Sequence, residues 1–123
     1  MNFQPICEID PDGTKYWYLN DQLHREDGPA IESVNGSKFW WLDGQFHRIH
    51  GPACEWSDGR KEWWLNGKRH RDDGPALELA DGTKYWYLNA NQLNPRKSIN
   101  DLELKNRYPE LVTSMLVYLV HNS

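Results

Sequence analysis

Three His-Arg pairs recur along the chain and are its most conspicuous candidates for polar chemistry. They are His24-Arg25, His47-Arg48 and His70-Arg71. A planar guanidinium donates two parallel hydrogen bonds to a carboxylate or a phosphate, so the arginines could bind an anion or an acidic peptide. They could instead pair internally with nearby acids such as Glu26-Asp27 and Asp72-Asp73. We favour the internal ladder, because side chains repeated in every unit of an array usually serve its structure.

The middle pair differs from its neighbours. Ile49-His50 stands where the others have two acids, so Arg48 is the least neutralised arginine. If an anion binds, we expect it near Arg48, His47 and His50. The spacing of His47, His50 and Cys54 loosely suits a metal, but the chain has only one other cysteine, so we predict neither a metal nor a cofactor.

These pairs belong to a repeat of 23 residues without insertions, visible in the turn glycines, a tryptophan, a leucine and a Gly-Pro-Ala motif. The repeated positions are Gly13, Gly36, Gly59 and Gly82; Trp17, Trp40, Trp63 and Trp86; Leu19, Leu42, Leu65 and Leu88; and residues 28–30, 51–53 and 74–76.

Each unit contains two turn signals and two short runs that are rich in aromatic and aliphatic residues. Asn66-Gly67 and Asp58-Gly59 are both typical of two-residue type I′ hairpins, which need positive φ at both central positions. We predict a mainly β, elongated antiparallel sheet of hairpins with C-terminal α-helices capping it. The units lie near 12–34, 35–57 and 58–80, with a partial unit at 81–97.

Alternation along each strand separates two faces. The invariant Trp and Leu positions are assigned to the core. The opposite face is also aromatic and carries Tyr18, Trp41, Trp64 and Tyr87. We favour packing beneath the C-terminal helices for this second stripe; a surface that stacks bases or binds a partner is the alternative. Trp41, Trp64 and Trp56 are therefore candidate binding residues.

Residues 98–123 contain neither glycine nor tryptophan and form the predicted helical cap. A short helix is expected over 99–106, starting at the capping-box-like Ser98 to Asp101, and a second begins at Pro109. Leu111, Met115, Leu116 and Leu119 fall at helical spacing. Since this apolar arc is wide, the helix could also contact a partner or form a homodimer.

Composition narrows the class of protein. The chain has 123 residues, of which 13% are aromatic and 26% charged, and a net charge of -4. The aromatic content favours a folded domain, and the acidic balance argues against nucleic-acid binding. No signal peptide and no membrane span is visible, so we expect a cytoplasmic protein. Known catalytic motifs are absent, and we expect no enzyme.

The stretch from Trp63-Trp-Leu-Asn-Gly-Lys to Ala80-Asp-Gly resembles the MORN repeat and its bacterial and phage variants. Unit length, tryptophan, turn glycine and Gly-Lys fit over roughly residues 7–92. His-Arg and Gly-Pro-Ala depart from the family pattern. The resemblance implies a single-layer sheet of hairpins that binds or scaffolds, and it carries over no catalytic residue.

A non-catalytic protein-binding module is therefore the favoured function. By family resemblance we expect a partner-blocking inhibitor, such as a phage anti-defence protein of anti-CRISPR type acting in the host cytoplasm, or an antitoxin that masks a toxin. One alternative is a small-ligand binder that sequesters a nucleotide signal through Trp and Arg/Lys contacts. Another is a structural or assembly module.

Overall fold

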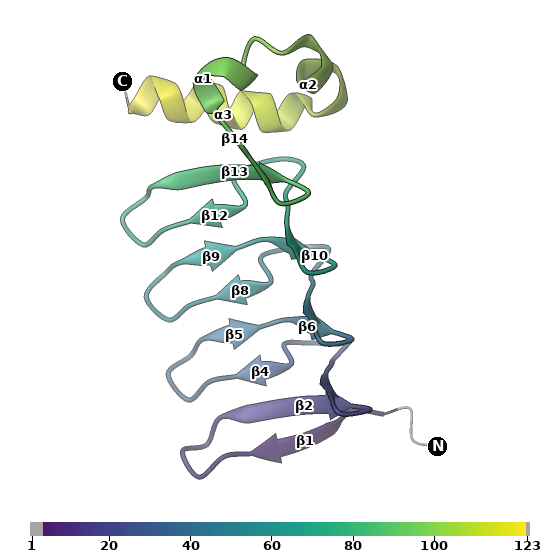
Figure 1. Ribbon diagram of the computed structural model, residues 1–123. Coiled ribbons are helices and arrows are strands. Elements are labelled where there is room, and N and C mark those ends of the chain that lie inside the picture. The colour runs from purple at the N-terminus through teal and green to yellow at the C-terminus, as the bar shows by residue number, and fades with distance from the viewer. Residues whose placement is uncertain (1–3, 123) are drawn as a thin grey trace.

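The computed structural model describes residues 4–122, which form a column of β-hairpins with three helices at one end (Figure 1). The strands are β1 Ile6–Ile9, β2 Lys15–Leu19, β3 Gln22–Leu23, β4 Ile31–Glu32, β5 Lys38–Phe39, β6 Trp41–Leu42, β7 Gln45–Phe46, β8 Cys54–Glu55, β9 Lys61–Glu62, β10 Trp64–Leu65, β11 Lys68–Arg69, β12 Leu77–Glu78, β13 Lys84–Leu88 and β14 Asn91–Leu93. The helices are α1 Pro95–Ser98, α2 Leu102–Arg107 and α3 Pro109–His121.

One ten-stranded antiparallel sheet runs the length of the column. Its order is β1-β2-β4-β5-β8-β9-β12-β13-β14, with β3 paired to β2. Two further pairs, β6 with β7 and β10 with β11, form hairpins at the side of the column (Figure 1). This confirms the predicted mainly β, elongated sheet of repeated hairpins; the division into domains stays a prediction.

The Gly-Pro-Ala corners form much of the interior. Ala30, Ala53 and Ala76 are fully buried, and their carbonyls accept hydrogen bonds from the backbone N–H groups of the repeated tryptophans at 2.7–2.8 Å. Of those tryptophans only Trp86 is fully buried, at 1% exposure. Assigning all four tryptophans to the core was therefore wrong, because the first three are half-buried beneath arginine side chains instead of beneath a second layer.

The two kinds of turn differ. The hairpin tips have positive φ at both central residues, as at Asn66 (φ 49°) and Gly67 (φ 75°), which agrees with the predicted type I′ geometry. At the opposite turns only the glycine has positive φ, as at Gly59, and the Asp58 carboxylate accepts the backbone N–H of Arg60 at 2.9 Å. Predicting type I′ turns there was wrong: a longer turn ending in a left-handed glycine closes these hairpins.

Cross-strand pairing builds a charged ladder on one face of the sheet. Lysine and glutamate alternate over seven adjacent strands, which places opposite charges side by side. The order is Lys15, Glu32, Lys38, Glu55, Lys61, Glu78 and Lys84. Each repeated lysine therefore has a glutamate on a neighbouring strand, and Lys84 forms an ion pair with Glu78 at 3.0 Å.

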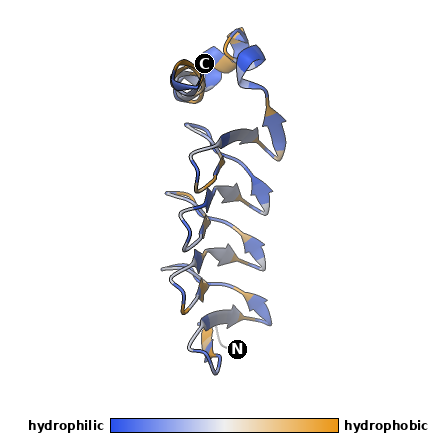
Figure 2. Cartoon of the chain, turned by 90° about the vertical axis from the view of Figure 1, so that its left-hand side faces the viewer, coloured by the Kyte–Doolittle hydropathy of each residue, from blue (hydrophilic) through white to orange (hydrophobic). Residues whose placement is uncertain are grey.

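The helices cap the C-terminal end of the array. In both views they stand beyond the last hairpin, and no helix formed by residues 4–122 lies along the column (Figures 1 and 2). The helices pack on Trp86 of the last unit, which contacts Leu111 and Met115. The expectation that these helices cover the second aromatic stripe was therefore wrong: they close the end of the column and leave its length uncovered.

The helix boundaries also differ from those predicted. Ser98 ends α1, and the residue that caps α2 is Asp101, whose carboxylate accepts the backbone N–H of Leu104 at 3.1 Å. The helix expected over 99–106 occupies 102–107 because Asp101, and not Ser98, satisfies its first free N–H groups. Pro109 opens α3 as predicted.

Among residues 4–122, no helix has the length and apolar character needed to cross a bilayer. The longest, α3, has 13 residues and so measures only about 20 Å at 1.5 Å per residue.

Candidate functional site

The repeated arginines stack on the repeated tryptophans of their own units. The guanidinium carbons of Arg25, Arg48 and Arg71 lie 3.9, 3.7 and 4.0 Å from the ring centroids of Trp17, Trp40 and Trp63. Each Nη1 also donates to the carbonyl oxygen of the proline in the next corner, at 3.0–3.1 Å. We call the surface formed by these six residues the arginine face. Its arginines take the place that a second sheet would occupy in a sandwich.

Glycine is required beside each arginine for space. A Cβ added at Gly74 would lie 2.8 Å from the Arg71 guanidinium carbon, and one at Gly28 would lie 3.0 Å from that of Arg25. Each guanidinium is therefore held between an indole ring and a glycine backbone, and a larger residue there would displace it.

Each of the three arginines pairs with a carboxylate, but only two of them do so through Nε and an aspartate. Nε of Arg25 donates to Asp27 at 3.0 Å, and Nε of Arg71 donates to Asp73 at 2.9 Å. Arg48 has His50 at the corresponding position and is paired with Glu55 at 3.3 Å. The structure thus brings the predicted internal ladder together, and Arg48 has fewer carboxylate partners than Arg25.

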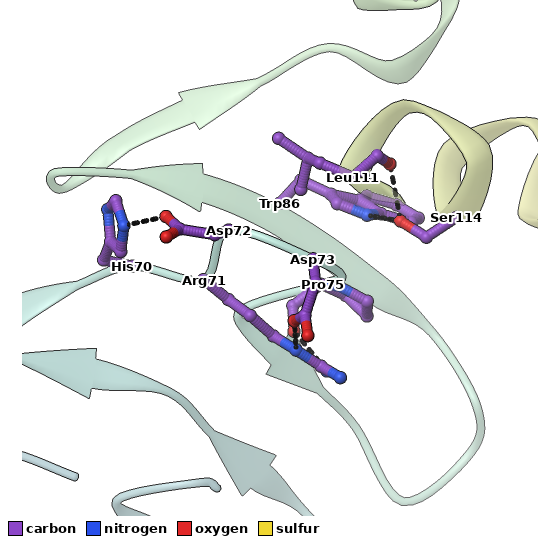
Figure 3. A network of polar contacts seen from close by, with 8 residues as sticks. All are labelled: His70, Arg71, Asp72, Asp73, Pro75, Trp86, Leu111 and Ser114. Carbon is purple, nitrogen blue, oxygen red and sulfur yellow. Dashed lines mark hydrogen bonds and ion pairs between the residues drawn. The ribbon is translucent and has the colours of Figure 1, made fainter. Parts of the chain in front are cut away.

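The repeated histidines join neighbouring units. Nδ1 of His24, His47 and His70 accepts the backbone N–H of the hairpin-tip residue one unit further along, Asp43, Asn66 or Asn89, at 2.9–3.0 Å. His70 also pairs through Nε2 with Asp72 (Figure 3). Because Nδ1 accepts, the neutral ring carries its proton on Nε2. His47 is therefore committed to a structural contact.

A groove of about 440 Å³ separates the corners of the second and third units. Arg48 and His50 line one side, Asp72 and Asp73 line the other, and Trp63 contributes to its lining. Of the predicted anion-binding residues, Arg48, His50 and Arg71 line this groove, and His47 is not among its lining residues. Asp72 pairs with His70 and Asp73 with Arg71, which reduces the positive charge that the groove offers to a phosphate.

The opposite side of the sheet carries aromatic rings in all four units and is here called the aromatic face. It consists of Tyr16, Tyr18, Phe39, Trp41, Phe46, Trp64, Tyr85 and Tyr87, all half-buried. Phe46 lies between Trp41 and Trp64, with ring centroids 4.1 and 5.4 Å away. Tyr16 and Tyr18 also stack on each other, and the helices stand beyond the end of the column (Figure 2).

A polar cluster interrupts this face in the third unit. The Glu62 carboxylate accepts hydrogen bonds from Nε1 of Trp56 at 3.0 Å, Nη2 of Arg60 at 3.1 Å and Nη2 of Arg69 at 2.7 Å. We call these four residues the Glu62 cluster. Burial alone would raise the pKa of Glu62, but the hydrogen bonds from Trp56 and Arg69 and the two positive charges lower it below 4.5.

The sequence predicted a binding role for Trp56 but missed Arg60, Glu62 and Arg69. The available signal was that each departs from the repeat. Glu62 stands where the other units have Tyr16, Phe39 and Tyr85, and Arg69 stands where two of them have Leu23 and Phe46. Antiparallel pairing of Trp64 with Arg69 then brings Arg69 to the aromatic face.

Cys54 lies beside the cluster and is buried. Its burial, together with the charge of Glu62, raises the pKa of the thiol to about 12. The predicted grouping of His47, His50 and Cys54 is not assembled, since Cys54 belongs to the aromatic face and His47 binds Asn66. Within residues 4–122 no group of three or more His, Cys, Asp or Glu side chains is placed to hold a metal.

The predicted contact helix α3 divides its apolar residues between cap and surface. Leu111 and Met115 are fully buried against Trp86, whose Nε1 donates to Ser114 at 2.8 Å (Figure 3). Leu119 is half-buried, whereas Leu116 is 44% exposed. The first two residues therefore belong to the cap, and contact with a partner stays a prediction for the other two.

Comparisons with protein-family models, with curated proteins and with solved structures found no match.

Proposed function

We propose that the chain is a non-catalytic protein-binding repeat module that acts by covering a functional surface of its partner. The observation that carries this proposal is the aromatic face, which extends over all four units and has no helix along it (Figures 1 and 2). Its rings are half-buried, and partly exposed aromatic surface is typical of protein interaction sites.

The dimensions of this face support the proposal. Eight successive strands from β1 to β13 span roughly 34 Å at about 4.8 Å per strand. Such a length accommodates a standard interface of about 800 Å² per partner. Tryptophan, tyrosine and arginine, which concentrate binding energy at interfaces, all occur on it, as Trp64, Tyr87 and Arg69.

A blocking role is the specific form of this proposal, and it rests on the resemblance to phage and bacterial MORN-like repeats. Such a module would inhibit a host defence component or mask a toxin in the cytoplasm. Binding of a small nucleotide is less favoured, because Asp72 and Asp73 line the groove that would have to accept its phosphates.

Affinity capture followed by footprinting tests the proposal. The tagged full-length chain is used to capture partners from a lysate of its own organism and, for a phage protein, of the host. Hydroxyl-radical oxidation of the purified complex then reports which side chains are covered. We expect a stoichiometric partner that protects Trp41, Trp56 and Trp64. Absence of such a partner, or protection confined to the arginine face, would contradict the proposal.

Blocking is measured separately, as loss of the captured partner's own activity when the chain is added. A partner that binds with full activity would leave a structural or assembly module as the better account.

A further inference from the structure

The four residues of the Glu62 cluster are departures from a regular array, and they converge on one place. Glu62 replaces an aromatic residue and Arg60 a serine or threonine; the equivalent residues are Tyr16, Phe39 and Tyr85, and Thr14, Ser37 and Thr83. Arg69 stands where the other units have Leu23, Phe46 and Gln92, and Trp56 stands where Asp10, Ser33 and Leu79 occur. All four side chains meet through the Glu62 carboxylate.

The cluster carries one uncompensated positive charge. Two guanidinium groups, those of Arg60 and Arg69, face the single carboxylate of Glu62. The repeated lysines belong to the opposite side of the sheet, where they pair with glutamates. A positive charge set among aromatic rings is less screened than one in open water, so it attracts an anionic group more strongly.

The geometry leaves part of the cluster accessible. The Arg60 side chain is 40% exposed, whereas that of Glu62 is 5% exposed. The Arg69 guanidinium lies 5.0 Å from the ring centroids of both Trp64 and Tyr87. The Nε groups of Arg60 and Arg69 are buried and have no hydrogen-bond partner among the described residues, so access to the cluster depends on the exposed part of the Arg60 side chain.

We propose that the Glu62 cluster binds an aspartate or glutamate side chain of a protein partner, with flanking apolar residues of that partner lying on the aromatic face. This inference rests on the proposed protein-binding function and specifies the chemistry that the partner presents. Arg60 and Arg69 receive the carboxylate, Trp56 and Trp64 contact the apolar neighbours, and Glu62 positions both arginines.

A nucleic acid is the less favoured occupant. Tight binding to a phosphate backbone needs several neutralised phosphates, and this face offers one surplus charge in a chain of net charge -4. An acidic side chain within an apolar segment matches both the charge and the aromatic surroundings.

Peptide titration monitored by NMR tests the site without knowledge of the partner. The probe is a blocked peptide with one glutamate flanked by leucine and phenylalanine, compared with its glutamine counterpart and with a single-stranded oligonucleotide. We expect the glutamate peptide to shift the Nε–H signals of Arg60 and Arg69 and to bind about tenfold more tightly than the glutamine peptide. Equal shifts from both peptides, or shifts caused only by the oligonucleotide, would overturn the proposal.

Variants that carry the residues of the other units test whether peptide binding is lost while the fold is kept. Arg60→Thr installs the residue of the first and fourth units, and the triple variant Arg60→Thr, Glu62→Phe, Arg69→Phe replaces the ionic group by the aromatic pair of the second unit. Both are expected to fold and to bind the glutamate peptide at least tenfold more weakly. Arg48→Gln, on the arginine face, is the matched control and should bind as the wild type. Unchanged binding by the folded triple variant would overturn the proposal.

The same variants distinguish failure of the site from failure of the function. If a captured partner binds the wild type and the triple variant equally, protein binding stands and the assignment of the site is wrong. If the glutamate peptide binds as expected and no partner is captured, the site stands and the proposed function falls.

Discussion

At the scale of single residues, Glu62 shows how one carboxylate can be buried in an aromatic surface. It contacts three donors, and each replaces part of the hydration that burial removes. Its closest contact, with Arg69, joins two residues seven positions apart that both replace apolar residues of the repeat. The pair is therefore interdependent: either residue alone would leave a charge with little compensation.

Glu62 should make the free energy of unfolding depend on pH in the acidic range. Its pKa is lower in the folded chain than the ordinary 4.5, so the folded state favours the ionised carboxylate. The resulting stability is present above the unfolded-state pKa and is lost as pH falls through the folded-state pKa. Urea denaturation between neutral pH and about pH 2 measures it. The double variant Glu62→Phe, Arg69→Phe should lose less free energy of unfolding over this range than the wild type.

At neutral pH, the single variant and the double variant should differ in their free energy of unfolding. Glu62→Phe alone leaves Arg69 largely buried without its carboxylate and should destabilise the chain by about 3 kcal/mol, whereas the double variant should lie within about 1.5 kcal/mol of the wild type. Equal losses for the two variants would show that the pair is not coupled.

At the scale of elements, α3 covers the repeated tryptophan of the last unit, whereas an arginine side chain covers it in the other units. In the first three units a guanidinium covers the repeated tryptophan, but the fourth unit has Asn94 where Arg71 stood. Leu111, Met115 and Tyr118 cover Trp86 instead, with the Tyr118 ring centroid 5.1 Å from that of Trp86. The loss of the His-Arg pair and the gain of a helix are thus two parts of one change.

Removing residues 108–123 should therefore expose Trp86 and leave its indole N–H without Ser114. We expect the truncated chain to melt at a lower temperature and to aggregate, because Trp86 loses the apolar side chains of Leu111 and Met115 that bury it. Differential scanning calorimetry and light scattering measure both effects. A truncated chain that is equally stable and monodisperse would instead identify α3 as a contact element. Leu116→Ser, which alters only an exposed position, is the control.

The repeat explains why so much of the architecture could be predicted. A 23-residue period with glycine turns specifies hairpins, and alternation along Lys61 to Leu65 separates the two faces. The sequence did not reveal what covers each face, because that depends on where the Gly-Pro-Ala corners fold. The Asn66-Gly67 turn sets the register that places Arg69 opposite Trp64, but the contact of Arg69 with Glu62 joins β11 to β9, which no local motif predicts.

At the scale of the whole molecule, units are joined in one direction by the histidines. His47 in the second unit accepts the backbone N–H of Asn66 in the third, and Arg48 donates its own backbone N–H to the carbonyl of Trp64 at 3.1 Å. Stability should therefore be the sum of the units and of these contacts between neighbours.

His47→Ala tests this coupling. It removes the acceptor of the Asn66 N–H and should lower the free energy of unfolding by about 1 kcal/mol, as measured by urea denaturation. His50→Ala, at an exposed position three residues away, should change it by less than about 0.5 kcal/mol. Equal effects of the two variants would indicate that the contact between units contributes nothing to stability.

Because the histidine contacts link each unit to the next one, the array can be lengthened. Copying residues 35–57 in place would reproduce both the histidine contact and the arginine stack, and would add two strands, or about 10 Å, to the column. The cap on Trp86 and the strand β1 would remain at the two ends. Gene duplication could thus tune the reach of such a protein in fixed increments, while the third unit alone keeps the charged cluster that distinguishes it.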